Sequence, residues 1–382
     1  MVIAFLYPTM FHPHWGGVER VADALAREFV SRGHRVIFIH NRLDLEKLAY
    51  DYPAPMYFLA ESTARATAAN LDSFHRIIDK EKVDAVINHC GGMIESELYC
   101  NAGKSDCRVI SIIHRNPYNN YHSLFHEIYP LKNSSFIEKI KRLVRIGLYP
   151  KLKHDYLVRL KKSYADLLSL TDQTVLLSEA FVPEMKELNP LLECCAIPNP
   201  LPFNIPENIS GKKNIILWVG RMDRVQKRPD RMIEIWKSIC RRLPGWSLVM
   251  IGDGEYLNFV KERAGKLPRI QFTGFTDPRP YYAKARILCM TSSFEGFGMV
   301  LLEAMAYGCV PFAFDSFAAA KDLLPNPEQR LDPFNIRQYS DRLIKYAENS
   351  EAYDALVKSC RKHVEDYRVE SIVDKWEKLL KK

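Results

Sequence analysis

The stretch Ser292–Gly308 constrains the fold of this chain most; it reads SSFEGFGMVLLEAMAYG. The apolar run Ile287–Met290 comes just before it and is typical of a buried strand. Gly296 and Gly298 then predict a tight turn, and apolar residues at helical spacing follow as far as Gly308, where a helix stop is expected. A helix that begins in this way directs free backbone N–H groups into the turn, so the pattern indicates an anion-binding site.

Two carboxylates flank this turn: Glu295 lies before the expected helix and Glu303 lies inside it. A carboxylate next to a phosphate repels it, so we expect these two to accept hydrogen bonds from neutral hydroxyls of a sugar or a ribose. The spacing alone fits equally well a structural loop that carries two solvated glutamates.

The alternation of strand and helix begins at the N-terminus. Val2–Tyr7 is an apolar run typical of a buried parallel strand, a glycine loop and an apolar helical stripe follow, and Arg35–Ile39 is the next strand. This opening is that of a dinucleotide-type α/β fold, but the G-x-G-x-x-G fingerprint is absent, and Gly16 and Gly17 are adjacent instead. The sequence therefore favours doubly wound parallel sheets and weakens an interpretation as an NAD-binding protein.

The length of 382 residues, with 47% hydrophobic and 26% charged residues, is typical of a globular chain with two domains. The proline-rich segment Ile197–Pro202 has the composition of the linker between them. The apolar start of the chain is short and has no basic lead, so it predicts a strand and not a signal peptide. Nine scattered cysteines, an odd count, indicate no disulfide framework, and the expected location is the cytoplasm.

The net charge of +8 is concentrated in one segment. Ten Lys or Arg lie between Lys132 and Lys162 against two acidic residues, which gives 10 − 2 = +8. Within it, Phe136–Tyr149 has the pattern of an amphipathic helix with a basic face. Such a helix is either an ordinary surface helix or a peripheral contact with an anionic membrane, here the inner face of the cytoplasmic membrane, and the charge favours a membrane contact through residues 136–162. Nucleic acid is not expected, because the aromatic residues form no stacking array.

The complete pattern S-x-x-E-G-F-G-x(4)-E-A-M-A-x-G, with Glu295 and Glu303 in the spacing E-x(7)-E, resembles the retaining glycosyltransferases of family four with the GT-B fold. Three more segments resemble the same family: H-W-G-G-V-E-R in the first loop, I-P-N-P at the linker, and G-R-x(5)-K after the first strand of the second domain.

The resemblance implies two doubly wound Rossmann-like domains that face a central cleft. We expect an acceptor-side domain at residues 1–198 and a donor-binding domain at residues 199–364. A C-terminal helix at about residues 365–382 is expected to cross back to the first domain.

The resemblance also implies a role for each matching residue. Glu295 is expected to contact the donor sugar, Glu303 to hold the ribose, and Arg221 with Lys227 to clamp the diphosphate through charge-assisted bonds. Because such a lysine has few packing contacts, we expect Lys227→Ala to change fold stability little. The remaining expected donor-binding residues act as glycines in the loops, through their backbone N–H groups, or at the edge of the site for the nucleotide base. They are Gly16, Gly17, Phe275, Gly296, Phe297, Gly298, Met299 and Val300.

His114 follows the apolar run Arg108–Ile113, at a strand end where ligands bind in open α/β sheets. A single histidine is usually structural. Many members of the family carry a histidine here that contacts the donor sugar, and the resemblance implies that catalytic role for His114. His89, after the preceding strand, is a weaker candidate.

The expected function is transfer of a hexose or N-acetylhexosamine, with retained configuration, from a nucleotide-sugar to a saccharide or lipid-linked glycan of surface polysaccharide biosynthesis. Phe314–Leu324 resembles the subgroup motif F-D-x-x-x-G-x-K-E/D, with Ala319 in place of the glycine, and this favours a UDP-sugar over a GDP-sugar. No cofactor or metal is expected, because the chain has no D-x-D pair and its own cations replace the metal. A GT-B-like nucleotide-sugar epimerase and a non-catalytic basic binding protein stay open as alternatives. The sugar, acceptor, linkage and oligomeric state are left open as well.

Overall fold

The computed structural model describes residues 1–12, 16–47, 49–63, 65–91, 107–118, 121, 124, 136–167 and 170–381. The chain forms two compact units. Unit 1 comprises residues 1–121, 144–203 and 367–382, and unit 2 comprises residues 122–143 and 204–366. The limits expected from the sequence lie at residues 198/199 and 364/365.

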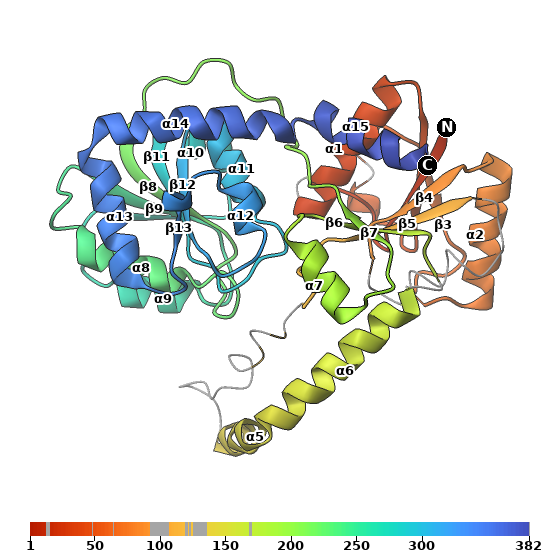
Figure 1. Ribbon diagram of the computed structural model, residues 1–382, viewed down its shortest axis with the longest axis horizontal. Coiled ribbons are helices and arrows are strands. Elements are labelled where there is room, and N and C mark those ends of the chain that lie inside the picture. Colours follow the sequence, from red (N-terminus) through yellow and green to blue (C-terminus); the bar gives the residue numbers. More distant parts are fainter. Residues whose placement is uncertain are drawn as a thin grey trace. The chain divides into compact units, whose positions relative to one another are not determined.

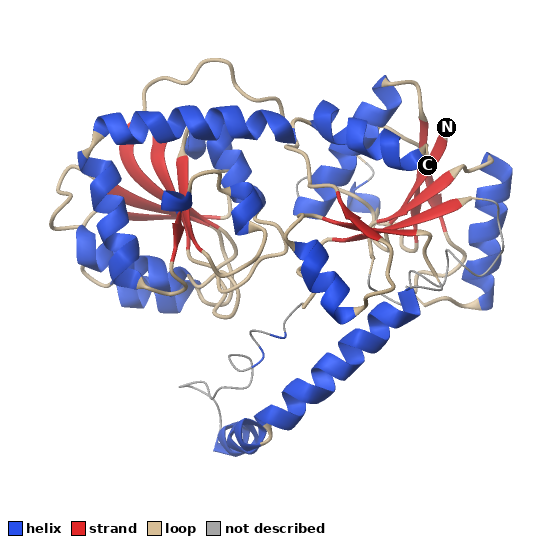
Figure 2. Ribbon diagram, viewed as in Figure 1, coloured by secondary structure: helices blue, strands red, loops and turns tan. Residues whose placement is uncertain are grey.

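Unit 1 is built on a seven-stranded parallel sheet with the strand order β3-β2-β1-β4-β5-β6-β7. Its central strands are almost wholly apolar because helices cover both faces of the sheet (Figure 2). Its strands are β1 (Val2–Leu6), β2 (Arg35–His40), β3 (Met56–Phe58), β4 (Ala85–Asn88), β5 (Arg108–Ile113), β6 (Gln173–Leu176) and β7 (Cys194–Ala196), and its helices are α1 (Gly17–Ser31), α2 (Ala68–Glu81), α6 (Tyr149–Leu167), α7 (Phe181–Leu188) and α15 (Val369–Leu380), with a 3-10 turn η1 (Leu45–Lys47).

Unit 2 repeats this plan with a six-stranded parallel sheet in the order β10-β9-β8-β11-β12-β13. Its core contains the buried indoles of Trp218 and Trp236. Its strands are β8 (Lys213–Val219), β9 (Ser247–Ile251), β10 (Ile270–Gly274), β11 (Ala285–Met290), β12 (Val310–Phe314) and β13 (Arg330–Leu331), and its helices are α8 (Pro229–Ile239), α9 (Leu257–Ala264), α10 (Arg279–Lys284), α11 (Met299–Ala306), α12 (Ala320–Leu323), α13 (Ile336–Glu348) and α14 (Ser350–Val364).

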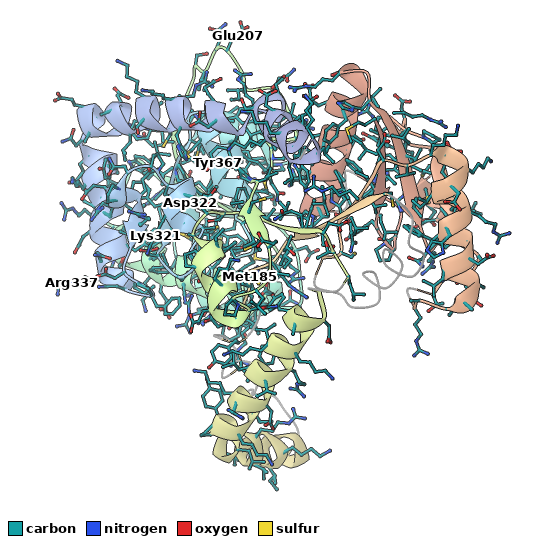
Figure 3. All side chains as sticks on the ribbon, turned by 45° about the vertical axis from the view of Figure 1, so that its right-hand side comes forward. Met185, Glu207, Lys321, Asp322, Arg337 and Tyr367 are labelled. Carbon is teal, nitrogen blue, oxygen red and sulfur yellow. The ribbon has the colours of Figure 1, made fainter. Side chains whose placement is uncertain are left out.

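The C-terminal helix α15 belongs to unit 1, where it packs against α1 (Figure 1). Arg32 at the end of α1 pairs with Asp374 at 2.6 Å, and His34 lies 3.0 Å from the carboxylate of Glu377. The fold class predicted from the sequence, two Rossmann-like units with a returning C-terminal helix, is therefore confirmed. In Figure 3, the labelled Met185 belongs to α7 and is buried in unit 1, whereas Arg337 projects from α13 into solvent.

One helix boundary differs from the prediction. The basic amphipathic pattern predicts a single helix over Phe136–Tyr149, but α5 (Phe136–Gly147) ends at its glycine and α6 begins at Tyr149. Gly147 offers little helix propensity, and Pro150 favours the first turn of a new helix, so the break follows from local chemistry.

Candidate functional site

The strand order of unit 2 places the carboxyl ends of β8 and β11 side by side. The chain winds from β8 to β9 and β10 on one side, then returns to β11 and β12 on the other. In open parallel sheets, ligands bind at such a reversal, outside the carboxyl ends of the strands. The loop from Gly220 to Arg228 follows β8 and the loop from Thr291 to Gly298 follows β11, so the two motifs predicted from the sequence meet here.

Lys227 and Glu295 form an ion pair between these two loops. Nζ of Lys227 lies 2.7 Å from Oε1 and 2.9 Å from Oε2 of Glu295. Oε1 also accepts a hydrogen bond from the Ser292 hydroxyl at 2.5 Å, and Oε2 accepts one from the Gln226 amide at 3.1 Å. The Glu295 side chain is only 4% exposed, and a carboxylate buried to this degree needs such compensation of its charge.

Asp223 shapes the loop that carries both cations. Its Oδ1 accepts hydrogen bonds from the backbone N–H groups of Val225, Gln226 and Lys227 at 3.1, 2.6 and 3.3 Å. Its Oδ2 accepts one from Nε of Arg221 at 3.3 Å. Aspartate that accepts backbone N–H groups in this way fixes a tight turn, so Asp223 determines where Arg221 and Lys227 lie.

Thr291 connects the same loop to the end of β11. Its hydroxyl accepts a hydrogen bond from the buried indole of Trp218 at 2.9 Å, and it lies 3.1 and 3.0 Å from the carbonyl oxygens of Lys227 and Arg228. Its carbonyl oxygen accepts a bond from the Arg231 guanidinium at 3.0 Å. These contacts hold the two loops in a preformed arrangement.

The loop after β9 comes close to this backbone through two glycines. Gly252 and Gly254 have φ values of 135° and 149°, which side chains rarely adopt. A Cβ on Gly252 would lie 1.8 Å from the carbonyl oxygen of Gly220, and a Cβ on Gly254 would lie 2.5 Å from that of Met222. Glycine at both positions thus allows three strand-end loops to pack together.

Glu303 lies in α11, which begins directly after Gly298 with its φ of 99°. The Glu303 side chain is buried, and its Oε2 accepts a hydrogen bond from the hydroxyl of Tyr282 at 3.0 Å. Tyr282 itself is completely buried in α10. Because both Glu295 and Glu303 are buried and bonded, the interpretation of this motif as a loop with two solvated glutamates is wrong.

In unit 1, two histidines lie at neighbouring strand ends. His89 follows β4 and His114 follows β5; their rings stack with centroids 5.4 Å apart, and Nδ1 of His89 lies 3.2 Å from Nε2 of His114. Burial lowers the pKa of His114 to about 4. Burial, together with the adjacent His114, also lowers the pKa of His89 well below its usual value, so both rings are neutral at pH 7. Within the described part of the chain, Nδ1 of His114 and Nε2 of His89 have no hydrogen-bond partner.

The glycine pair of unit 1 lies at the start of α1. Gly16 is the N-cap residue and Gly17 the first helical residue. A Cβ on Gly16 would lie 2.3 Å from Oε2 of Glu19, so the G-G-x-E pattern brings this carboxylate against the Gly16 backbone.

Two sequence-family models match almost the whole chain. The model described as Glycosyltransferase Family 4 matches residues 15–201, and the model described as Glycosyl transferases group 1 matches residues 203–363. The chain belongs to this family of glycosyltransferases.

The two relatives described here are each less than 30% identical to this chain. An uncharacterized glycosyltransferase of Haemophilus influenzae is 29% identical over 233 residues, which are 58% of this chain and 65% of that protein. A Campylobacter jejuni protein named GalNAc-alpha-(1->4)-GalNAc-alpha-(1->3)-diNAcBac-PP-undecaprenol alpha-1,4-N-acetyl-D-galactosaminyltransferase is 25% identical over 235 residues, which are 59% of this chain and 62% of that protein. The chain thus spans less than two thirds of the length of either relative.

Similarity in structure extends over the complete chain. The crystal structure of Anabaena HepE in complex with UDP and glucose has a TM-score of 0.73 at 14% sequence identity, and the match covers 100% of this chain and 99% of that chain. At this identity the likeness is one of fold.

In this member of the family, the predicted site residues form two groups. Unit 1 carries Gly16, Gly17 and His114, each described above. Phe275, just after β10, is exposed, whereas the Phe297 side chain is buried. Unit 2 gathers the rest of the predicted set at its strand ends: Arg221, Lys227, Glu295, Gly296, Phe297, Gly298, Met299, Val300 and Glu303.

The structure also corrects one expectation and adds residues. Lys227 does not lie apart as a lysine with few contacts, so the reason for expecting an unchanged stability in Lys227→Ala is wrong. Sequence reasoning missed the residues that support the pair, although an aspartate two positions after Arg221 is a recognisable turn signal. The missed residues are Asp223, Gln226, Thr291, Ser292 and Tyr282. Among the described residues, no group of three His, Cys, Asp or Glu side chains is placed to hold a metal ion.

Proposed function

We propose that this protein is a retaining glycosyltransferase that moves a hexose or N-acetylhexosamine from a UDP-sugar to a saccharide or lipid-linked glycan in surface polysaccharide biosynthesis. The observation that carries the proposal is the Lys227–Glu295 pair at the strand reversal of unit 2, beside the helix that begins after Gly298. A cation next to the N–H groups of a helix N-terminus is suited to a diphosphate. The undecaprenol in the name of the C. jejuni relative and the UDP bound to HepE support these acceptor and donor classes.

Each charged residue has a distinct part in donor binding. The ammonium of Lys227 has three N–H donors, and the Glu295 carboxylate takes two of them, which leaves one for a diphosphate oxygen. The guanidinium of Arg221, 68% exposed, supplies a second cation from the same loop. Glu303, oriented by Tyr282, accepts hydrogen bonds from the ribose hydroxyls.

The contacts of Glu295 favour front-face transfer over a covalent intermediate. A carboxylate has about four acceptor positions. In Glu295, Oε1 accepts from Lys227 and Ser292, and Oε2 accepts from Lys227 and Gln226, so no lone pair is left to attack the sugar.

In the proposed step, the bond between the anomeric carbon and the diphosphate oxygen breaks, and its electron pair stays on the diphosphate. The acceptor hydroxyl forms the new bond on the same face and gives its proton to the departing phosphate oxygen. Arg221, Lys227 and the N–H groups after Phe297 stabilise the growing negative charge. No metal or cofactor takes part in this scheme.

The lipid-linked acceptor implies a working place at a membrane. We therefore also propose that the enzyme is cytoplasmic and that it contacts an anionic membrane surface peripherally. We do not propose that it binds nucleic acid.

A thermal-shift screen with UDP- and GDP-sugars tests the donor class, because a ligand that binds the native state raises the melting temperature by mass action. We expect a rise with UDP-sugars, and stabilisation by GDP-mannose without any UDP-sugar would contradict the choice. Product analysis without acceptor then identifies an epimerase, which needs no acceptor. Failure of every nucleotide to bind would favour a non-catalytic basic binding protein.

A further inference from the structure

The ring of His89 is enclosed by aromatic side chains of unit 1. His89 is 2% exposed, and its ring centroid lies 5.0 Å from that of Phe5 and 5.4 Å from that of Phe11. Its backbone N–H donates a hydrogen bond to the carbonyl oxygen of Leu6 at 3.0 Å, where β4 ends beside β1. A ring packed in this way has little freedom to turn, so any effect of His89 on a ligand has to pass through a neighbouring side chain.

That neighbour is His114, which is half-buried at the end of β5. Strand β4 pairs with β5 in parallel (Figure 1). Gly91 allows the chain after β4 to approach β5 closely, because a Cβ at this position would lie 2.4 Å from the carbonyl oxygen of Ile112. This arrangement of the backbone brings Nδ1 of His89 to 3.2 Å from Nε2 of His114.

The hydrogen bond between the two rings couples their tautomers. A neutral imidazole has one N–H donor and one bare nitrogen that accepts. If Nδ1 of His89 donates, His114 carries its own proton on Nδ1. If Nε2 of His114 donates instead, Nδ1 of His114 is bare and the proton of His89 lies on Nε2. One outer nitrogen of the pair is therefore always a donor, and the other is always an acceptor.

Burial favours the arrangement in which His89 donates. The two outer nitrogens are Nε2 of His89 and Nδ1 of His114, and neither has a hydrogen-bond partner among the described residues. An N–H group without a partner costs most where the ring is most deeply enclosed, since neither water nor a ligand reaches it. The outer N–H is thus better placed on the half-buried ring of His114, and His89 keeps the bare nitrogen.

We propose that His89 is a positioning residue whose Nδ1–H donates to Nε2 of His114 and thereby fixes His114 as an Nδ1–H donor toward a neutral oxygen of the substrate. Hydroxyl and ring oxygens of a sugar accept such a bond. A buried N–H without a protein partner is then a group reserved for the ligand. The assignment rests on the proposed glycosyl transfer, because the acceptor of the bond is a sugar oxygen, but the tautomer can be observed without any transfer.

The test is a long-range proton–nitrogen NMR spectrum of the intact protein with isotope-labelled histidine, recorded at neutral pH without ligand. The protonated and the bare nitrogen of a neutral imidazole give well-separated signals, and His89→Phe and His114→Phe assign them by the signals that disappear. In the wild type we expect the proton of His114 on Nδ1. In His89→Phe the two tautomers of His114 should exchange and give averaged signals. His89→Asn should restore the wild-type pattern, because its amide N–H replaces Nδ1–H.

The kinetics of the same variants show whether the tautomer matters for transfer. His89→Phe should lower kcat/KM about two- to tenfold, the effect of one neutral hydrogen bond, and His89→Asn should recover most of this loss. The thermal shift with UDP should be unchanged in both. His40→Phe is the matched control, because His40 is a completely buried histidine at the end of β2 whose ring also lies against Phe11, at 5.3 Å. It should leave the signals of His114 and the kinetics as in the wild type.

A wild-type spectrum in which Nε2 of His114 carries the proton, wholly or in exchange, would overturn the inference. So would an unchanged His114 pattern in His89→Phe, or the same change in His40→Phe. If His89→Phe does not fold, the wild-type spectrum by itself determines the tautomer. A wild-type protein that shows no thermal shift with UDP would contradict the proposed function instead, and the tautomer of His114 would stand.

Discussion

The strand-end loops of the two units differ in the charge that they present. In unit 2 they hold an ion pair, a turn-forming aspartate and an exposed arginine, joined by several hydrogen bonds. In unit 1 the described strand ends after β4 and β5 carry two stacked histidines whose pKa values are lowered by burial. The two sheets share a plan, yet the strand ends after β8 and β11 carry an ion pair, whereas those after β4 and β5 carry two rings that are neutral at pH 7.

The difference indicates that two units with the same fold suit different parts of a substrate. An anionic leaving group needs fixed cations, and a preformed network supplies them without reorganisation during the reaction. A neutral sugar or acceptor needs hydrogen-bond donors and acceptors, which neutral imidazoles provide. We therefore expect phosphate chemistry to depend on unit 2 and the histidines of unit 1 to act as neutral groups.

The largest effect is expected for Lys227→Ala, which removes the cation of the ion pair in unit 2. Since a hydrogen bond to a charged group contributes roughly 1.5–3 kcal/mol and the opposing charge grows in the transition state, kcat/KM should fall about ten- to a thousandfold. Stability should also fall, by about 1–3 kcal/mol, because the buried Glu295 carboxylate loses its cation. Steady-state kinetics beside a thermal melt measure both.

The double variant Lys227→Ala/Glu295→Gln separates the two losses. Without a buried charge to compensate, it should recover much of the stability while the rate stays low. A single variant with near-normal kcat/KM would exclude the diphosphate clamp. A double variant as unstable as the single one would show that the ion pair is not the cause.

The next effect distinguishes the two glutamates of unit 2. Glu295→Gln should lower kcat by roughly tenfold or more, because an amide no longer holds the Lys227 ammonium by charge. Glu303→Gln should mainly weaken UDP binding, by about five- to twentyfold, since it alters a hydrogen-bond acceptor for the ribose. Nucleotide affinity by calorimetry and kcat for both variants give the comparison. The reverse pattern would exchange the two assignments.

The sequence predicts which strand end carries each of these residues, but not which side chains touch. Hydrophobic periodicity and helix-terminating residues predict α11, its end near Gly308 and the helix Val369–Leu380, because these signals are local. Lys227 and Glu295 are 68 residues apart, and their contact depends on β8 and β11 being neighbours. Strand order is a property of the complete sheet, and no local pattern contains it.

The contact between the two histidines also depends on strand order and could not be predicted from the sequence. The sequence places His114 and His89 after two strands, and the stacking of their rings follows only from the pairing of β4 with β5. The low pKa values then come from burial by residues distant in sequence, which periodicity does not reveal. Residue types at strand ends are thus predictable, whereas their protonation and partners are not.

A smaller effect is expected for Asp223, which touches the cations and not the substrate. Asp223→Ala should lower kcat/KM by about five- to thirtyfold, because the loop that aims Arg221 and Lys227 loses its acceptor. Asp223→Asn keeps an oxygen for the three backbone N–H groups and should restore most of the activity. Asp341→Ala, which removes an exposed aspartate on α13, is the control. Equal activity of the Ala and Asn variants would contradict a positioning role.

The smallest effect concerns the pH dependence of unit 1. The pKa of His114 is about 4 in the folded chain, below the ordinary value near 6.5, so the unfolded chain binds more protons between these limits. The stability that neutral His114 contributes is therefore complete above pH 6.5 and is lost as the pH falls toward 4. By pH 5 we expect a loss of about 1–2 kcal/mol, seen as a lower denaturation midpoint.

His114→Phe keeps an aromatic ring at this position that cannot take up a proton, so this loss between pH 6.5 and 5 should become shallower. The exposed His154 on α6 serves as the control, since His154→Phe should leave the slope as it is. Urea titrations at several pH values measure the slope for each variant. If His114→Phe and the wild type lose stability in parallel, the ring is charged or solvated in the native state. His114 would then not act as a buried neutral group, and the division of work between the two sheets would not hold.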